Sequence, residues 1–139
     1  MKKIGFLAGA FDIIHPGYIH MFEAAKNNCD WLVVGLQTDP SIERPDKLTP
    51  ILSFVDRMTM LKSIKYIDEV RSYTTEDDLI LIITELNPDV RFLGDDYHNK
   101  PFTADHLNIP IHYVDRSHNW SSTKMKQLIY QQIKQQKHG

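Results

Sequence analysis

The chain has 139 residues, which is the length of one ordinary domain. Hydrophobic residues make up 42% and charged residues 24%, a globular rather than a disordered composition. The formal net charge of -2 disfavours a protein that wraps nucleic acid, since such proteins are clearly basic. A single cysteine excludes an internal disulfide and a cysteine-based structural zinc site. No apolar run is long enough to span a membrane, so we expect a soluble, cytoplasmic protein.

The first half of the chain alternates short apolar runs with amphipathic ones. Residues 4–8 predict a buried strand, and the turn-rich residues 9–17 lead into a helix beginning near Pro16, since proline suits a first helical turn. The continuous apolar run 31–36 predicts a second strand covered on both faces. Residues 38–50 hold three prolines and predict a long loop, of a length that is usually functional or mobile.

The second half of the chain continues the same alternation. Ser53 predicts a helix cap, and Thr75, followed by three acidic residues, predicts another. The expected elements are helices over about 53–65 and 75–86, strands over 66–70, 90–93 and 109–114, a last helix from Ser121 or Ser122, and a frayed polar tail over about 130–139.

Strands that alternate with helices in this way predict an α/β fold. We expect a Rossmann-like, doubly wound, five-stranded parallel sheet with helices on both faces, in a single domain over 1–139. In such sheets the ligand lies beyond the carboxyl ends of the strands. Three turn segments that follow strands, at 9–17, 94–96 and 116–123, are therefore expected to meet at one crevice.

The turn after the first strand has the composition of a phosphate site. Gly9 lets the backbone come close to a ligand, and the helix that follows offers free N–H groups and a partial positive charge. His15 stands directly before that helix, where it either donates to a phosphate oxygen or only caps the helix. Its occurrence together with Gly9, Asp12 and Gly17 after a strand favours the phosphate site.

The last turn segment predicts a second helix start that binds phosphate. Residues 121–123 supply three hydroxyl groups where capping needs one, and Arg116 lies just upstream. Residues 94–96, Gly-Asp-Asp, follow a strand and fit either an ordinary turn or a part of the same site.

These residues resemble a known family. Residues 9–17, GAFDIIHPG, resemble the G-x-F-D-x-x-H-x-G-H signature of the cytidylyltransferase group of nucleotidyltransferases. Residues 116–124, RSHNWSSTK, resemble the R-x-x-x-I-S-[ST]-T-x-[IL] segment that closes the same site. Residues 94–97, GDDY, Arg57 and residues 66–70, YIDEV, look like parts of glycerol-3-phosphate cytidylyltransferases. The resemblance runs from about residue 4 to residue 128.

The resemblance implies transfer of CMP from CTP to a small phosphorylated acceptor similar to glycerol 3-phosphate, with release of pyrophosphate. It implies in-line attack at the α-phosphorus without a covalent intermediate. Such a reaction depends mostly on positioning and electrostatics, which agrees with a pocket built from helix starts. Magnesium is expected as cofactor, held mainly by the triphosphate.

The resemblance also implies roles for individual residues. His15, Tyr18, Lys47 and Arg116 are the expected catalytic residues, and Lys47 and Arg57 the expected acceptor ligands. A solvated loop lysine and a helix-surface arginine are the alternative interpretations of the last two. The expected nucleotide ligands are Gly9, Ala10, Phe11, Asp12, His15, Gly17, Gly94, Asp95, Asp96, Arg116, Ser121, Ser122 and Thr123. Asp12 is either an outer partner of the metal or a turn-stabilising residue.

The sequence departs from the signature at Tyr18, where the family has its second histidine. A phenol donates a hydrogen bond but cannot become a cation. Loss of a cationic donor costs on the order of 2–4 kcal/mol if nothing replaces it. Trp120 stands where the family has isoleucine and either walls the nucleotide pocket or fills the core.

Two other functions stay open at this point. One is an adenylyltransferase that uses ATP with a sugar-phosphate or flavin-type acceptor, since such enzymes share the first signature and also fit residues 121–123. The other is a nucleotide-binding module without turnover. We expect the partners to be a nucleoside triphosphate and a phosphorylated small molecule, with no nucleic acid and no membrane, and we expect a homodimer.

Overall fold

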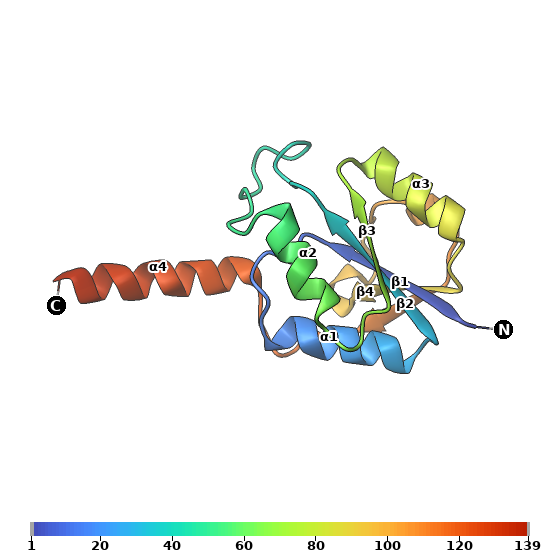
Figure 1. Ribbon diagram of the computed structural model, residues 1–139, viewed down its shortest axis with the longest axis horizontal. Coiled ribbons are helices and arrows are strands. Elements are labelled where there is room, and N and C mark those ends of the chain that lie inside the picture. Colours follow the sequence, from blue (N-terminus) through green and yellow to red (C-terminus); the bar gives the residue numbers. More distant parts are fainter. Residues whose placement is uncertain (1, 139) are drawn as a thin grey trace.

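We describe the protein from a computed structural model that covers residues 2–138 (Figure 1). Strands alternate with helices along the chain, as the sequence predicted. The elements are β1 (Ile4–Gly9), α1 (Pro16–Asn27), β2 (Trp31–Gln37), α2 (Phe54–Lys62), β3 (Glu69–Tyr73), α3 (Glu76–Leu86), β4 (Val90–Gly94), β5 (Ile111–Val114) and α4 (Ser122–His138), with short 3-10 turns at Asp95–Tyr97 and Asp105–Leu107.

The five strands form one parallel sheet in the order β3-β2-β1-β4-β5. The strand order reverses direction at β1, which makes the carboxyl ends of β1 and β4 the switch point where ligands of such sheets bind. The predicted Rossmann-like α/β fold is confirmed. The segments that follow β1, β4 and β5 all leave the sheet at this edge.

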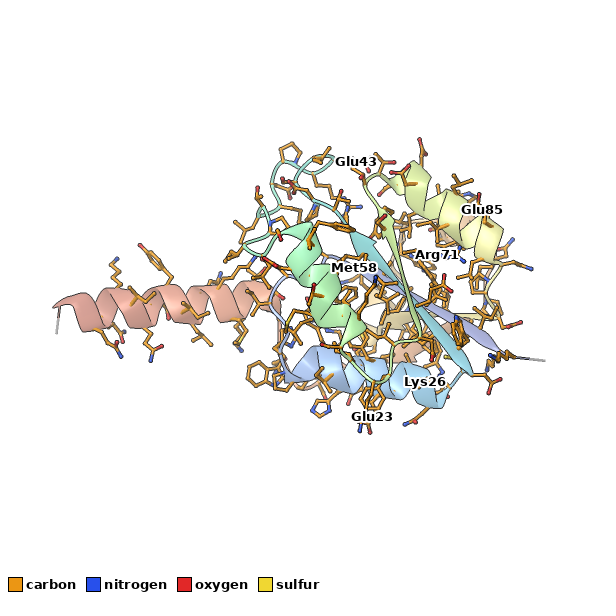
Figure 2. The ribbon with its side chains drawn as sticks, viewed as in Figure 1. Glu23, Lys26, Glu43, Met58, Arg71 and Glu85 are labelled. Carbon is orange, nitrogen blue, oxygen red and sulfur yellow. The ribbon has the colours of Figure 1, made fainter. Side chains whose placement is uncertain are left out.

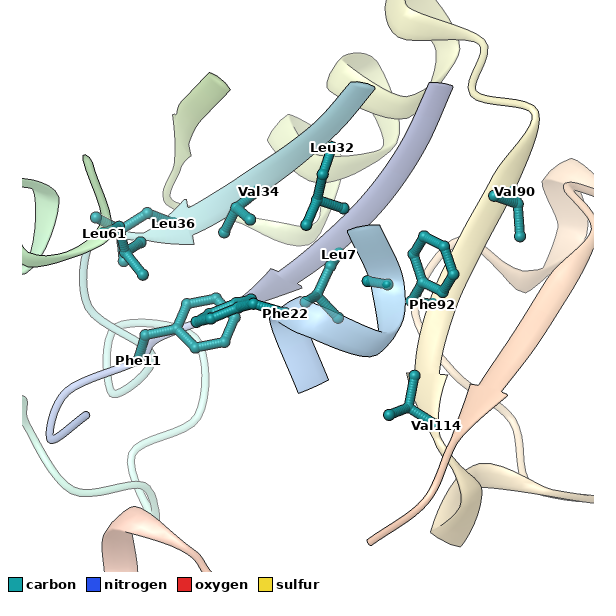
Figure 3. Packing of buried hydrophobic residues seen from close by; sticks show 11 residues of the cluster. Leu7, Phe11, Phe22, Leu32, Val34, Leu36, Leu61, Val90, Phe92 and Val114 are labelled. Atoms are coloured by element: carbon teal, nitrogen blue, oxygen red, sulfur yellow. The ribbon is translucent and has the colours of Figure 1, made fainter. Parts of the chain in front are cut away.

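Helices α1 and α2 cover one face of the sheet. Phe22 and Ala25 of α1 and Leu61 of α2 are fully buried there against apolar residues of the strands (Figure 3). Phe22 packs its ring against that of Phe11, with ring centroids 5.3 Å apart. The buried apolar area of these side chains holds α1 on the sheet and so fixes the position of its N-terminus.

Helix α3 covers the opposite face, so the sheet is covered on both sides. Leu79 and Ile83 of α3 pack there with Phe6, Val33 and other apolar residues. The start of α3 has a complete capping box, in which the Thr75 hydroxyl accepts from the Asp78 N–H and the Asp78 carboxylate accepts from the Thr75 N–H.

Strand β3 differs from its prediction, since it spans 69–73 and not 66–70. The side chains of Tyr66 and Asp68 tie this turn to α1, through two α1 residues that Figure 2 labels, Glu23 and Lys26. The Tyr66 hydroxyl donates to Glu23 over 2.7 Å, and Lys26 pairs with Asp68 over 2.6 Å. Asp68 also accepts from the Leu32 N–H, and the ladder with β2 begins only after it.

Two predicted helices also differ in length. Ser53 caps α2 as predicted, by accepting from the Asp56 N–H, but α2 ends at Lys62 and not near 65. Helix α4 continues to His138, where we predicted fraying from about residue 130. Figure 1 shows α4 projecting from the body of the domain, and its apolar side chains beyond the second turn are exposed. Among the described residues, no helix has both the length and the hydropathy needed to cross a membrane.

Candidate active site

His15 caps α1 and is held at the sheet edge by that bond. Its Nδ1 accepts from the Tyr18 N–H over 3.3 Å, so the neutral ring carries its proton on Nε2. The residue is only 4% exposed. Nε2 is buried, and no hydrogen-bond partner for it occurs within residues 2–138. A buried donor without a partner costs stability, so this atom needs an explanation beyond capping.

Aromatic rings surround the His15 imidazole. The Tyr18 ring stacks on it with centroids 4.0 Å apart, and Trp120 lies nearly parallel to it at 5.9 Å. Burial, together with nearby His118 and Arg116, lowers the pKa of His15 from 6.5 to about 4. The ring is therefore neutral at pH 7 and acts there as a hydrogen-bond donor through Nε2.

A hydrogen-bond chain joins the starts of α1 and α4. The Tyr18 hydroxyl lies 3.0 Å from the Ser122 hydroxyl, which donates to the Ile13 carbonyl over 3.1 Å. Residues that are more than 100 positions apart thus share one network. Tyr18 thus contacts His15 through its ring and Ser122 through its hydroxyl, as the predicted convergence of the turn segments requires.

The end of β4 joins the same group through Arg116. A Cβ atom on Gly94 would lie 2.5 Å from Arg116 Cδ, so the arginine stem needs a glycine at this position. The Arg116 guanidinium donates to the Trp120 carbonyl over 3.2 Å. The contact between Gly94 and Arg116 brings the segments at 94–96 and 116–123 together, and Arg116 lies beside His15.

A pocket opens between the start of α1 and residues 115–120. It is lined by His15, Gly17, Tyr18, Met21, Asp115, Arg116, His118 and Trp120. The Asp115 carboxylate accepts from the backbone N–H and the hydroxyl of Ser117, both at 2.9 Å. The other ionisable side chains that line the pocket are an arginine, histidines and a tyrosine, so the lining suits an anion.

Asp12 serves as an anchor for two parts of the site. It is 4% exposed and accepts from the Ile51 and Leu52 N–H groups, over 2.7 and 2.9 Å. Its carboxylate also pairs with Lys126 of α4 over 2.5 Å. Burial raises the pKa of Asp12, but Lys126 and the two backbone donors outweigh this and hold it below its ordinary value. Asp12 thereby ties the end of the 38–53 loop to α4.

Arg57 lies in the interior of the protein. From the sequence we predicted instead that it binds the acceptor or lies on the surface of its helix. It is 1% exposed, and its guanidinium donates to four backbone carbonyls. The acceptors are Leu52 at 3.1 Å, Ala10 at 2.9 Å, Gln37 at 2.6 Å and Thr38. The geometry makes Arg57 a link between the β1 turn, the end of β2 and the long loop, with four of its five N–H donors occupied.

The other expected site residues fall into two groups. Ser121 caps α4 by accepting from the Lys124 N–H over 3.0 Å, and Ser122 is used in the network with Tyr18. Thr123, Lys47, Asp95 and Asp96 have exposed side chains, so they stay available to a ligand.

The turn after β1 has a strained backbone. Phe11 has a left-handed φ of 48°, and its ring packs over Gly9, where an added Cβ would lie 2.9 Å from Phe11 Cζ. Gly9 is therefore needed for the position of Phe11. Ala10 offers its carbonyl to Arg57. Strain of this kind persists only where the surroundings impose it, and it is common at ligand sites.

Sequence reasoning missed four side chains at or near this site, namely Met21, Asp115, His118 and Lys126. Lys126 lies four residues after Ser122, on the same face of α4, and this spacing was the available signal. His118 lies against α1, which no local pattern of the 116–123 turn indicates. Among the described residues, no group of three histidine, cysteine or acidic side chains is placed to hold a metal ion.

Comparison with known proteins relates this chain to bacterial enzymes. The bifunctional protein HldE of Hyphomonas neptunium (strain ATCC 15444) is 44% identical over 96 residues, which are 68% of this chain and 20% of that protein. HldE of Campylobacter jejuni (strain RM1221) is 34% identical over 129 residues, 92% of this chain and 28% of that protein. The chain thus spans between 20% and 28% of the length of these relatives.

Solved structures share the fold. A lipopolysaccharide core biosynthesis protein from Thermoplasma volcanium GSS1 superposes with a TM-score of 0.65 at 27% identity, over 83% of this chain and 96% of that one. Pantothenate synthetase from Thermus thermophilus gives 0.56 at 12% identity, over 81% of this chain and 55% of that one, a likeness of fold alone. A family model described as cytidylyltransferase-like matches residues 6–134, which include the pocket and all three turn segments. The chain therefore belongs to the cytidylyltransferase-like family of nucleotidyltransferase enzymes.

Proposed function

We propose that the protein binds a nucleoside triphosphate at the pocket between the start of α1 and residues 115–120, and transfers its nucleotidyl group to a phosphorylated small molecule. The observation that carries this proposal is His15 Nε2, a buried N–H donor that has no partner among residues 2–138, at a pocket lined by Arg116 and His118. A phosphate oxygen would satisfy that donor. The starts of α1 and α4 add their partial positive charges beside it.

The proposed reaction is an in-line displacement. An oxygen of the acceptor phosphate attacks the α-phosphorus and forms the new P–O bond. The bond from the α-phosphorus to the bridging oxygen breaks, and pyrophosphate leaves with that electron pair. His15 donates a hydrogen bond to an α- or β-phosphate oxygen and keeps its proton. Arg116 and the free Thr123 hydroxyl bind the β- and γ-phosphates, and exposed Lys47 contacts the acceptor when the 38–53 loop closes.

Magnesium fits this pocket only as an ion carried by the nucleotide. Asp12 is the buried carboxylate within the turn at residues 9–17, and it already binds two N–H groups and Lys126. Mg²⁺ keeps several waters and commonly takes phosphate oxygens as ligands. Bound in that way, it neutralises charge on the triphosphate, while the protein side chains orient the phosphates.

We propose CTP as the donor, with ATP as the second candidate. The likeness of residues 94–97 to cytidylyltransferases supports CTP. Residues 121–123 fit adenylyltransferases equally well, which supports ATP. A solved relative is a lipopolysaccharide core biosynthesis protein, and such cores contain sugars, so we propose a phosphorylated sugar or polyol as acceptor.

A pyrophosphate-release assay tests the proposal. The full chain is mixed with Mg²⁺, each of CTP, ATP, GTP and UTP, and a panel of phosphorylated sugars and polyols, including glycerol 3-phosphate. We expect release with one acceptor class and with CTP. Release with ATP alone would replace CTP by ATP. Nucleotide binding in a thermal-shift assay without any release across the panel would favour a binding module, and the absence of both would refute the proposal.

A further inference from the structure

His118 is a second histidine at the pocket that the proposed reaction does not yet use. Its ring packs against the first turn of α1 at Gly17. A Cβ atom at Gly17 would lie 2.6 Å from His118 Cε1 and 3.0 Å from its Nδ1. The imidazole thus occupies the space that a side chain on α1 would need, and this contact holds it at the mouth of the pocket beside His15.

The orientation of the His118 ring is fixed by one hydrogen bond. Its Nδ1 accepts from the Trp120 N–H over 2.9 Å. The neutral ring therefore carries its N–H at Nε2. No hydrogen bond within residues 2–138 uses His118 Nε2, whereas Nδ1 is occupied. The ring is half-buried, so Nε2 is available to a ligand that enters the pocket.

The groups around His118 suit an anion at its free N–H. His15, Tyr18 and Arg116 line the same pocket, and His20 of α1 has its ring centroid 6.4 Å from that of His118. Asp115 also lines the pocket, and its carboxylate accepts from the backbone N–H and the hydroxyl of Ser117. The lining thus combines the Arg116 cation with the Nε2 donors of His15 and His118, an arrangement that a phosphate oxygen can use.

We propose that His118 binds a phosphate oxygen of the nucleotide through its Nε2–H, beside His15. This inference rests on the proposed function. It also bears on the departure at Tyr18, since His118 places a second imidazole N–H donor at the pocket although the second histidine of the family signature is missing. His118 donates a hydrogen bond and keeps its proton, so it adds no proton transfer to the reaction. This second donor reaches the pocket from the 116–123 turn rather than from α1.

The first test compares His118→Ala with the wild type in the transfer assay and in binding of inorganic tripolyphosphate. We expect kcat/KM to fall about 100-fold, the effect of losing a donor to developing charge. We expect the tripolyphosphate Kd to rise about tenfold, the effect of losing one charge-assisted hydrogen bond. His20→Ala is the matched control, because it removes a nearby imidazole of α1 that does not line the pocket, and it should stay within about twofold in both assays.

The second test asks whether position 18 can replace the lost imidazole. Tyr18→His, which places a histidine on the pocket side of α1, is introduced alone and into His118→Ala. We expect it to raise the kcat/KM of His118→Ala about tenfold and to help the wild type less, because the wild type still has the His118 N–H donor and His118→Ala does not. If Tyr18→His raises the kcat/KM of the wild type but not that of His118→Ala, then His118 does not stand in for the second histidine of the family signature.

The remaining outcomes separate this inference from the proposed function. A His118→Ala variant that unfolds at the wild-type temperature, yet keeps its tripolyphosphate Kd and its kcat/KM within about twofold, would overturn the inference and leave the reaction intact. A wild type without transfer activity would refute the reaction. In that case a weaker tripolyphosphate Kd in His118→Ala alone would still support His118 as a phosphate ligand.

Discussion

Arg57 and His15 are both buried polar residues near the end of β1, and they differ in how their donors are used. Arg57 is 1% exposed and donates to four carbonyls. His15 is 4% exposed and makes one bond through Nδ1, while Nε2 has no partner within residues 2–138. A buried group with its donors satisfied stabilises the fold. A buried group with one free donor at a pocket stabilises something that enters that pocket.

The free donor identifies a site only together with the pocket. Arg91 also has a buried Nε without a partner in the described part of the chain. Its guanidinium donates to the Thr103 carbonyl and lies 5.2 Å from the Phe102 ring centroid, on the α3 side of the sheet and away from the pocket. Arg91 therefore holds the 98–110 loop. The contrast supports the proposed role of His15, whose free donor lies at the switch point beside a pocket.

Removal of Arg57 is expected to have the largest effect on stability. Arg57→Ala leaves four carbonyl groups without their donor, and we expect the free energy of unfolding to fall by about 3–5 kcal/mol. Arg57→Lys should also destabilise, because an ammonium cannot span four acceptors in different directions. Urea denaturation measures both variants. Normal stability with weaker acceptor binding would instead restore Arg57 as an acceptor ligand.

Removal of His15 is expected to act on the reaction rather than the fold. His15→Asn keeps a good helix cap, so the free energy of unfolding should change by less than about 1 kcal/mol. The Nε2 donor is lost, and kcat/KM should fall about 100- to 1,000-fold. Steady-state kinetics and urea denaturation of the same sample give both numbers. Activity within a few-fold of wild type would remove His15 from the mechanism.

The pKa of His15 predicts how stability depends on pH. Its folded pKa, lowered to about 4, lies below the unfolded value of 6.5, so the unfolded chain binds the proton first as pH falls. Stability from this group is complete above pH 6.5 and is lost between pH 6.5 and 4, by up to about 3 kcal/mol. His15→Asn should flatten the pH curve of unfolding free energy in this window, and an unchanged slope would contradict the assignment.

The pattern of alternating runs was sufficient to predict the sheet and the meeting of the three turn segments. The exact bounds of β3 were not predictable, because the Asp68 carboxylate binds Lys26 and Leu32 from other elements. Burial of Arg57 was not predictable either, since its acceptors are backbone carbonyls and leave no trace in the side-chain sequence. Contacts between distant elements decide these features, whereas local periodicity decides where strands and helices occur.

Substitution of Asp12 tests how a buried carboxylate of the fold holds a loop beside the site. Asp12→Asn removes the charge that pairs with Lys126 and one of its carboxylate oxygens, and we expect a loss of about 1–3 kcal/mol in unfolding free energy. The 38–53 loop should also become more open to limited proteolysis, because Ile51 and Leu52 lose acceptor strength. Equal cleavage rates in variant and wild type would show that the other contacts of the loop, among them those of Arg57 and the Arg44–Glu76 ion pair, are enough to hold it.

Substitution of Tyr18 should have the smallest effect on unfolding free energy and on kcat/KM, because this residue contributes both to the fold and to the site. Its ring supports His15 by stacking, and its hydroxyl joins Ser122. Tyr18→Phe keeps the stack and removes one partly exposed hydrogen bond, so unfolding free energy should fall by about 1 kcal/mol. Because Ser122 still donates to the Ile13 carbonyl, α4 should keep its position and kcat/KM should fall less than about fivefold. A larger kinetic loss at unchanged stability would mean that the phenol O–H itself contacts the substrate.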